Sequence, residues 1–172
     1  WSTGNGTTTA ALVTGGETTP SGQITNTEEW DGSSWTAGGA YPSNFSAGAS
    51  GGTQTAALAF AGRSPSYLSS AAAYDGTSWS SKPSMSLARA MVGGTGTTSS
   101  AFASGGEAPG SPALKDVTEE FNSSTNAITA AAWASGGALP VAVYDGAGAG
   151  TQTAGLAFGG DTAPDGTAAG SY

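Results

Sequence analysis

The stretch Thr53-Gln54-Thr55-Ala56-Ala57-Leu58-Ala59-Phe60-Ala61-Gly62 returns, almost unchanged, as residues 151–160. Looser copies span residues 7–16 and 95–106, and the first threonines of the four copies are 46, 42 and 56 residues apart. Sequence periods of about 40–50 residues are typical of repeated supersecondary units, with propeller blades as the leading example. We therefore predict a single repeat array over residues 1–172, in which Thr-led strands starting near residues 7, 53, 95 and 151 mark the successive units.

Composition favours a folded chain and limits its partners. Leu, Ile, Val and Phe together make up only 19 of the 172 residues, but just 9% of residues are charged, and apolar words recur in register. Disordered chains combine low hydrophobicity with high charge and need no such recurrence. The four Lys and Arg residues are scattered, so we expect no nucleic-acid partner. The apolar runs are too short to span a membrane, and no signal segment opens the sequence.

A pair of aromatic residues follows each copy of the opening stretch. In Trp30-Asp31-Gly32-Ser33-Ser34-Trp35 and in residues 74–79, Asp-Gly lies between two aromatics, which is a strong hairpin signal. In a third copy Trp133 follows its aromatic, Phe121, by 12 residues rather than five because of an insertion, and the fourth copy stops at Tyr172. Counting back from each following threonine places Phe45, Leu87 and Val143 at one inward-facing strand position.

Each unit therefore supplies about four short strands, and we predict an all-β chain of about four antiparallel sheets. The residues expected to have structural roles in this pattern are Gly15, Gly16, Trp30, Trp35, Gly62, Tyr74, Trp79, Gly105, Gly106, Phe121, Trp133, Gly159 and Gly160. Small residues before a double glycine, then an aromatic and a Trp, resemble the kelch repeat. This resemblance covers nearly the whole chain and implies a kelch-like β-propeller, although Ala61 replaces one glycine.

The words Thr-Gln-Thr-Ala-Ala-Leu-Ala-Phe and Thr-Glu-Glu-aromatic more narrowly resemble kelch-like structural and fibre proteins of marine bacteriophages. That resemblance implies a non-enzymatic structural and recognition module of a virion appendage or other extracellular surface. Its expected partners are other structural subunits, copies of itself, and host surface glycans. A secreted bacterial adhesin or scaffold domain is the alternative, and a carboxylate-dependent glycan hydrolase ranks below both.

Catalytic and metal chemistry find little support in the residue types. The chain has no His and no Cys, whereas the copper oxidase among kelch proteins needs His, Tyr and a Cys-modified Tyr. We therefore expect no cofactor, no metal and no enzymatic activity. The pairs Glu28-Glu29 and Glu119-Glu120 cannot converge on one substrate atom, because adjacent strand residues point to opposite faces. We expect them on solvated strand edges, where charge discourages edge-to-edge pairing.

Binding residues are expected where the copies differ, in the segments that follow each double glycine. These segments are Glu17–Thr27, Arg63–Ala71, Glu107–Thr118 and Asp161–Ala169. The favoured contacts are Arg63 and Tyr67, since an aromatic beside a cation suits a glycan. The full set of candidate binding residues is Arg63, Tyr67, Lys115, Asp161 and Asp165.

Both ends of the sequence fall within a repeat, since Trp1 lies six residues before Thr7 and the chain stops at an aromatic. Three arrangements stay open: a fragment of a larger ring, a four-bladed ring with one thin blade, or two chains that pool their blades. The fragment is favoured because isolated repeats leave open edges and unburied faces.

Overall fold

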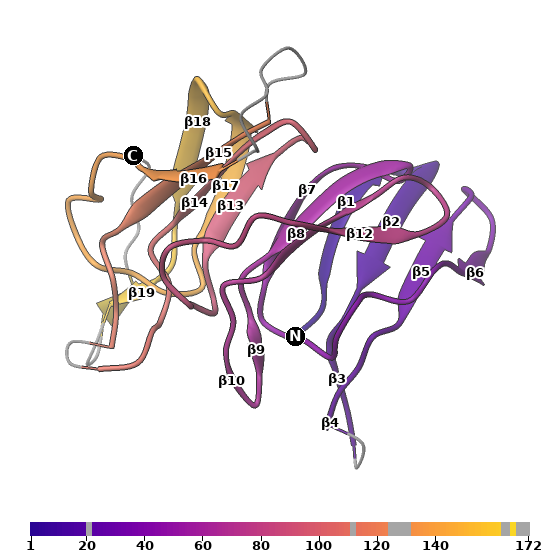
Figure 1. The fold of residues 1–172 in the computed structure, drawn as a ribbon, viewed down its shortest axis with the longest axis horizontal. Helices are drawn as coiled ribbons and strands as arrows, with labels where there is room; N and C mark the ends of the chain where they lie inside the picture. Colours follow the sequence, from indigo (N-terminus) through magenta and orange to yellow (C-terminus); the bar gives the residue numbers. More distant parts are fainter. Residues whose placement is uncertain (20–21, 111–112, 124–131, 163–165, 168–172) are drawn as a thin grey trace.

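The computed structural model describes residues 1–19, 22–110, 113–123, 132–162 and 166–167. Within these ranges the chain is all β and has no helix. Its larger elements are three four-stranded antiparallel sheets and one two-stranded hairpin, which follow one another along the chain (Figure 1). The prediction of an all-β chain built from small antiparallel sheets is confirmed.

Each four-stranded sheet pairs its strands in chain order. The first sheet contains β1 (Thr3–Thr7), β2 (Ala10–Thr14), β5 (Thr27–Trp30) and β6 (Trp35–Ala37). The second contains β7 (Ala49–Thr53), β8 (Ala56–Phe60), β11 (Ala71–Tyr74) and β12 (Trp79–Lys82). The third contains β13 (Gly93–Gly96), β14 (Ser100–Ser104), β15 (Thr118–Asn122) and β16 (Ala132–Ser135). The last hairpin consists of β17 (Ala147–Thr151) and β18 (Ala154–Phe158).

The opening stretch of each copy holds a turn and then one strand, so the prediction that the strand begins at the threonine is wrong. Thr53 ends β7, Gln54 and Thr55 form the turn, and the Ala-Ala-Leu-Ala-Phe word is β8. In the first copy the Thr7 hydroxyl accepts hydrogen bonds from the backbone N–H groups of Thr9 and Ala10, at 3.4 and 3.2 Å. A threonine hydroxyl that binds the backbone in this way favours a turn over a continuing strand.

The third copy starts two residues later than its sequence suggested. Gly96 lies opposite Ala101, as Gly52 lies opposite Ala57 in the second sheet. Thr97, rather than Thr95, is therefore the counterpart of Thr53. Its hydroxyl accepts hydrogen bonds from the backbone N–H groups of Ser99 and Ser100 in the turn that it begins. The sequence was misleading because it offers a threonine at both positions.

The first strands of the successive units lie side by side. β1 lies beside β7, β7 beside β13, and β13 beside β17 (Figure 1). These strands approach so closely that a Cβ on Gly51 would collide with the backbone nitrogen of Gly96. Glycine is therefore required by the spacing of the strands.

The predicted Asp-Gly hairpins are confirmed at residues 31–34 and 75–78, between β5 and β6 and between β11 and β12. The Asp31 carboxylate accepts hydrogen bonds from the backbone N–H groups of Ser33 and Ser34, at 2.7 and 2.8 Å. Asp75 binds its own turn in the same way. Gly32 adopts a φ of 96°, a left-handed conformation that glycine tolerates.

The aromatic pairs occupy matching registers but differ in burial. Trp30 lies opposite Trp35, and Tyr74 lies opposite Trp79. Tyr74 is buried and Trp79 half-buried against the first sheet, whereas Trp35 is 50% exposed, so its predicted core position is wrong. Trp79 is covered because its sheet packs on Leu12 of the first sheet. In the third sheet Phe121 is buried, and it pairs with Trp133, whose side chain lies outside the described residues.

The carboxylate pairs do not lie on sheet edges, so that prediction is also wrong. β5 lies between β2 and β6, and β15 lies between β14 and β16. The two members of each pair do lie on opposite faces, as the alternation of a strand requires. Glu119 is fully buried, while its neighbour Glu120 is half-buried on the other face of the third sheet. On these inner strands Glu29, Glu119 and Glu120 each accept a hydrogen bond, from Tyr74, Arg89 and Gln152 respectively.

Candidate functional site

The candidate site is built on the double glycines that end the second strand of each unit. Gly15-Gly16, Ala61-Gly62, Gly105-Gly106 and Gly159-Gly160 all have positive φ angles at both residues, and Ala61 adopts 62° although it is not glycine. This left-handed pair turns the chain out of the sheet. The segment after each pair then projects from the same end of its unit.

Three of the four segments contain a small hairpin. These hairpins are β3 (Glu17–Thr18) with β4 (Gly22–Gln23), β9 (Arg63–Ser64) with β10 (Ser66–Tyr67), and β19 (Asp161–Thr162) with β20 (Gly166–Thr167). β3, β4, β9, β10 and β19 lie along the lower edge of Figure 1. We call this surface, together with residues 107–110 and 113–114, the hairpin end.

Backbone bridges fix the hairpin end to the chain that enters each sheet. The N–H of Arg63 donates to the carbonyl of Ser46 at 2.9 Å, and the reverse bond measures 3.1 Å. Ala90 and Glu107 exchange the same two bonds in the third unit. Arg63 and Glu107, the first residues of their segments, are therefore held by main-chain contacts, which leaves their side chains available for the surface.

Arg63 is the centre of the best-defined cluster at this end. Its guanidinium carbon lies 5.1 Å from the ring centre of Trp1, which is 59% exposed. Its Nη2 lies 3.7 Å from Oε1 of Glu17, and both side chains are about 30% exposed. Tyr67 lies directly opposite Arg63 across the β9–β10 hairpin, so the two share one face. The structure thus brings together the two residues that the sequence favoured.

The charges of the cluster are set by local partners. Oε1 of Glu17 accepts hydrogen bonds from Gln23 at 3.0 Å and from the Ser46 hydroxyl at 2.9 Å. These two bonds, together with Arg63, lower the pKa of Glu17 and keep it ionised near neutral pH. Partial burial and the nearby Glu107 carboxylate raise the pKa of Tyr67, so its hydroxyl remains a donor.

The other predicted binding residues are carried by the later segments. The N–H of Lys115 donates to the carbonyl of Gly106 at 2.9 Å, which holds that segment against its glycines. Asp161 begins β19 and exchanges backbone bonds with Tyr144. Asp165 lies outside the described residues. Glu17, Arg63, Glu107 and Asp161 occupy the same place, directly after a double glycine, so each unit presents one charged residue there.

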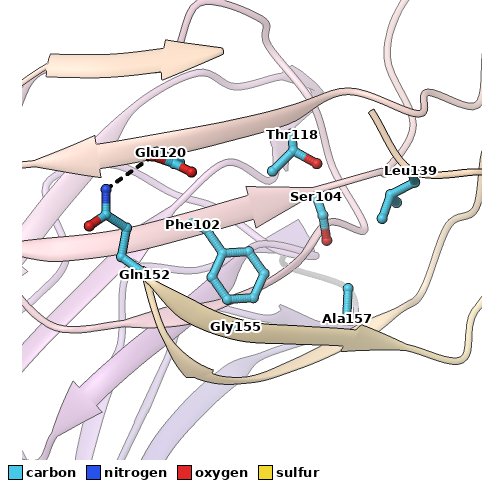
Figure 2. Close-up of a pocket in the computed structure, with 8 residues that line it drawn as sticks. All are labelled: Phe102, Ser104, Thr118, Glu120, Leu139, Gln152, Gly155 and Ala157. Carbon is cyan, nitrogen blue, oxygen red and sulfur yellow. Dashed lines mark hydrogen bonds between the residues drawn. The ribbon is translucent and has the colours of Figure 1, made fainter. Parts of the chain in front are cut away.

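A second concave site lies between the third sheet and β18. This pocket has a volume of about 180 Å³. Phe102 and Leu139 form its apolar walls, and Glu120, Thr118 and Ser104 its polar ones (Figure 2). Gln152, from the β17–β18 turn, donates to Oε2 of Glu120 at 3.1 Å. The sequence analysis missed this pocket. The sequence signal for this pocket was the repeated Gln of the Thr-Gln-Thr motif. Gln54 in the second copy likewise donates a hydrogen bond to the preceding sheet, at the carbonyl of Trp30.

Sequence reasoning also missed a buried ion pair between the second and third sheets. Arg89 and Glu119 are fully buried, and Nη2 of Arg89 lies 3.0 Å from Oε1 of Glu119. Nη1 of Arg89 donates to the carbonyls of Gly105 and Val117, at 2.6 and 2.8 Å. The N–H of Ser86 donates to the second carboxylate oxygen at 2.7 Å. With its charges neutralised and enclosed, this pair has a structural role.

Arg89, rather than Leu87, occupies the position shared with Phe45 and Val143. The second glycine of each pair donates its N–H to this position, from Gly16 to Phe45 and from Gly62 to Arg89. Leu87 is only half-buried, so its predicted inward-facing position is wrong. The two-residue error in the third copy, which came from counting back from Thr95, explains the mistake.

The chain matches no protein family, and no curated protein is significantly similar to it. In the part of the chain that the structure describes, no three Asp or Glu residues gather as a metal site would require. The same residues include no helix with the length and apolar character needed to cross a bilayer.

Proposed function

We propose that this chain is a kelch-like propeller array that acts as a non-catalytic recognition module, and that its hairpin end binds glycans. The observation that carries the proposal is the cluster of Trp1, Arg63 and Glu17, with Tyr67 beside it. Exposed aromatic faces can pack against the apolar faces of sugars, while fixed charged groups bind their hydroxyls. Such a combination, on short hairpins held by a rigid scaffold, suits recognition.

The arrangement of the first strands supports the propeller. Residues of β1, β7, β13 and β17 line one cavity of about 250 Å³, together with the residues that lead into these strands. One hydrogen bond also joins each unit to the next at the entry to these strands. Ala47 donates its N–H to Trp1 at 3.0 Å, Met91 to Ala47 at 2.7 Å, and Asp145 to Met91 at 3.1 Å. Successive units related by the same contact, around one cavity, are what a propeller requires.

The state of the carboxylates supports binding over hydrolysis. A glycosidase needs two carboxyl groups on either side of the scissile bond, one of them able to donate a proton. Glu119 is enclosed with Arg89, and Glu29 accepts a hydrogen bond from the hydroxyl of Tyr74. Glu17 is held ionised by its partners, which suits a hydrogen-bond acceptor rather than an acid.

We propose an extracellular surface or virion appendage as the location, where other structural subunits and host glycans are the partners. A glycan array probed with the wild-type chain tests the binding. We expect retention on a subset of glycans, and loss of most of it in Arg63→Ala and Tyr67→Ala. Lys82→Ala is the matched control, because Lys82 lies on the outer strand β12 and lines a hollow with Asp75 and Thr98 rather than the cluster around Arg63, and its loss should leave retention unchanged.

Three results would contradict the proposal. No retention on any glycan would exclude glycans as the ligand. An equal loss of retention in Lys82→Ala would show that retention depends on net charge rather than on the Arg63 cluster. Release of free sugars from a retained glycan, measured by mass spectrometry, would instead support the hydrolase. Circular dichroism spectra of all variants should be unchanged, which separates lost contacts from lost folding.

A further inference from the structure

Each sheet of the array has two packing faces, and the second sheet shows what each of them contacts. Tyr74 and Trp79 lie on one face, where they form an apolar cluster with Leu12 of the first sheet. Leu58 lies on the other face, where it is fully buried in a cluster with Phe121 of the third sheet. We call these the Trp face and the Leu face of a unit. The first two sheets therefore pack with the Leu face of one against the Trp face of the next.

The Trp face of the first sheet carries two tryptophans that remain accessible. Trp30 and Trp35 hold the register positions of Tyr74 and Trp79, and their ring centres lie 5.4 Å apart. Trp30 is half-buried and Trp35 is 50% exposed, whereas Tyr74 is buried. Ala11, which lies opposite Trp30 on the same face, is also half-buried. An apolar face that is covered in the second sheet is therefore accessible in the first.

The Leu face of the last hairpin is exposed as well. A Cβ on Gly155 would lie 2.5 Å from Cε1 of Phe102, so Gly155 faces the third sheet. Since side chains alternate along a strand, Leu156 and Phe158 lie on the opposite face of β18. They are 42% and 40% exposed, whereas the matching leucine and phenylalanine of β8 are fully buried. The chain therefore exposes both halves of a contact that it already uses between its own sheets.

These two faces lie at opposite ends of the array, since β6 and β18 are far apart in Figure 1. They cannot cover each other within one molecule, but each matches the face that the other presents, as Leu12 matches Trp79. Burial of tryptophan, leucine and phenylalanine side chains favours association in water. We infer that two copies of this chain pair head to tail, with the Trp face of the first sheet of each copy against the Leu face of β18 of the other.

A twofold arrangement covers both faces of both copies. A single contact would leave one Trp face and one Leu face exposed, and further copies would add to them without closing. β1 and β17 line one cavity, so the two ends of the array belong to an arc around it. A twofold axis through that cavity brings both contacts together in one closed pair. This pairing is independent of glycan binding, because it uses neither Arg63 nor Tyr67.

Sedimentation velocity of the full chain over a range of protein concentrations tests the inference. We expect a species with twice the mass of one chain. Trp35→Ala and Leu156→Asp should each weaken the pair roughly 30-fold or more, which corresponds to the loss of a hot-spot side chain. Val141→Asp is the matched control, because Val141 is 46% exposed but lies outside both faces, in the segment before β17. Unchanged circular dichroism spectra should show that all three variants fold.

Mixing the two variants separates a head-to-tail pair from one that joins like faces. A pair of one Trp35→Ala chain and one Leu156→Asp chain keeps one intact contact, so the mixture should associate more tightly than either variant alone. No gain on mixing would overturn the match of Trp face with Leu face. A wild-type chain that stays monomeric, a mass that rises beyond two chains, or equal weakening in Val141→Asp would also overturn the inference.

Discussion

Breaking the buried pair of Arg89 and Glu119 should be among the most destabilising single changes in this protein. Glu119→Ala leaves a fully buried guanidinium with two carbonyl partners and no counter-charge. Removal of one member of a buried pair costs about 3–5 kcal/mol. Domains of this size have a free energy of unfolding of about 5–15 kcal/mol, so this loss is a large share of the total.

Replacing both charges should cost much less than replacing one. Arg89→Phe introduces the residue found at the corresponding position, Phe45, and Glu119→Ala introduces the residue found at Ala72 in the second sheet. Apolar replacement of a whole buried pair is often neutral or stabilising. The double variant should therefore be more stable than Glu119→Ala alone, because Arg89→Phe removes the buried charge that Glu119→Ala leaves without a partner.

Urea denaturation followed by tryptophan fluorescence measures these free energies. Glu28→Ala is the matched control, because Glu28 holds the same place in the first sheet but is only half-buried, and its loss should change stability by about 0.5 kcal/mol or less. The reasoning would be refuted if Glu119→Ala cost under about 1 kcal/mol, or if the effects of Arg89→Phe and Glu119→Ala simply added in the double variant.

Two further predictions concern the turns. Gly106→Ala places a Cβ 2.6 Å from Cγ1 of Val92 at a φ of 92°, so we expect a loss of roughly 1–3 kcal/mol in urea denaturation, while Gly137→Ala, where a Cβ meets no atom within 4 Å, should cost far less. Hydrogen bonds from the Ser34 and Ser33 backbone and from the Ser33 hydroxyl lower the pKa of Asp31 to about 2. Because this folded-state pKa lies below the ordinary 3.8, the stabilisation is complete above about pH 4 and is lost as the pH falls towards 2. Asp31→Asn should therefore reduce the fall in melting temperature between pH 5 and 2, and an unchanged fall would contradict the assignment.

The sequence predicted the local elements because their signals are local. Asp-Gly between aromatics specified the hairpins after β5 and β11, and alternation along the strand separated Glu119 from Glu120. The errors came where a signal was shared by two positions or two structures. Threonine favours both strands and turns, so the hairpin at Thr53 was interpreted as one strand, and the extra threonine at 95 shifted the third copy by two residues.

Contacts between units were beyond local reasoning. Trp35 and Trp79 have the same register, but Trp79 is half-buried because its sheet packs on Leu12 of the first sheet, whereas Trp35 is exposed. The charge on Arg89 is tolerated only because the third sheet brings Glu119 and two carbonyls to it from residues 105–119. At the hairpin end, variable segments after the double glycines indicated Arg63 and Tyr67, which the structure places opposite each other in one hairpin. The contact of Trp1 with Arg63 had no sequence signal.

The sequence by itself determined the repeat period, the antiparallel hairpins and the double glycines that turn the chain outward, since each depends on the backbone preferences of a few neighbouring residues. Only the tertiary structure decided which carboxylates are buried, which aromatics pack against the preceding sheet, and which charges meet around Arg63. Those outcomes depend on how adjacent sheets pack, and residues 30 or more positions apart meet there through the stacking of whole units.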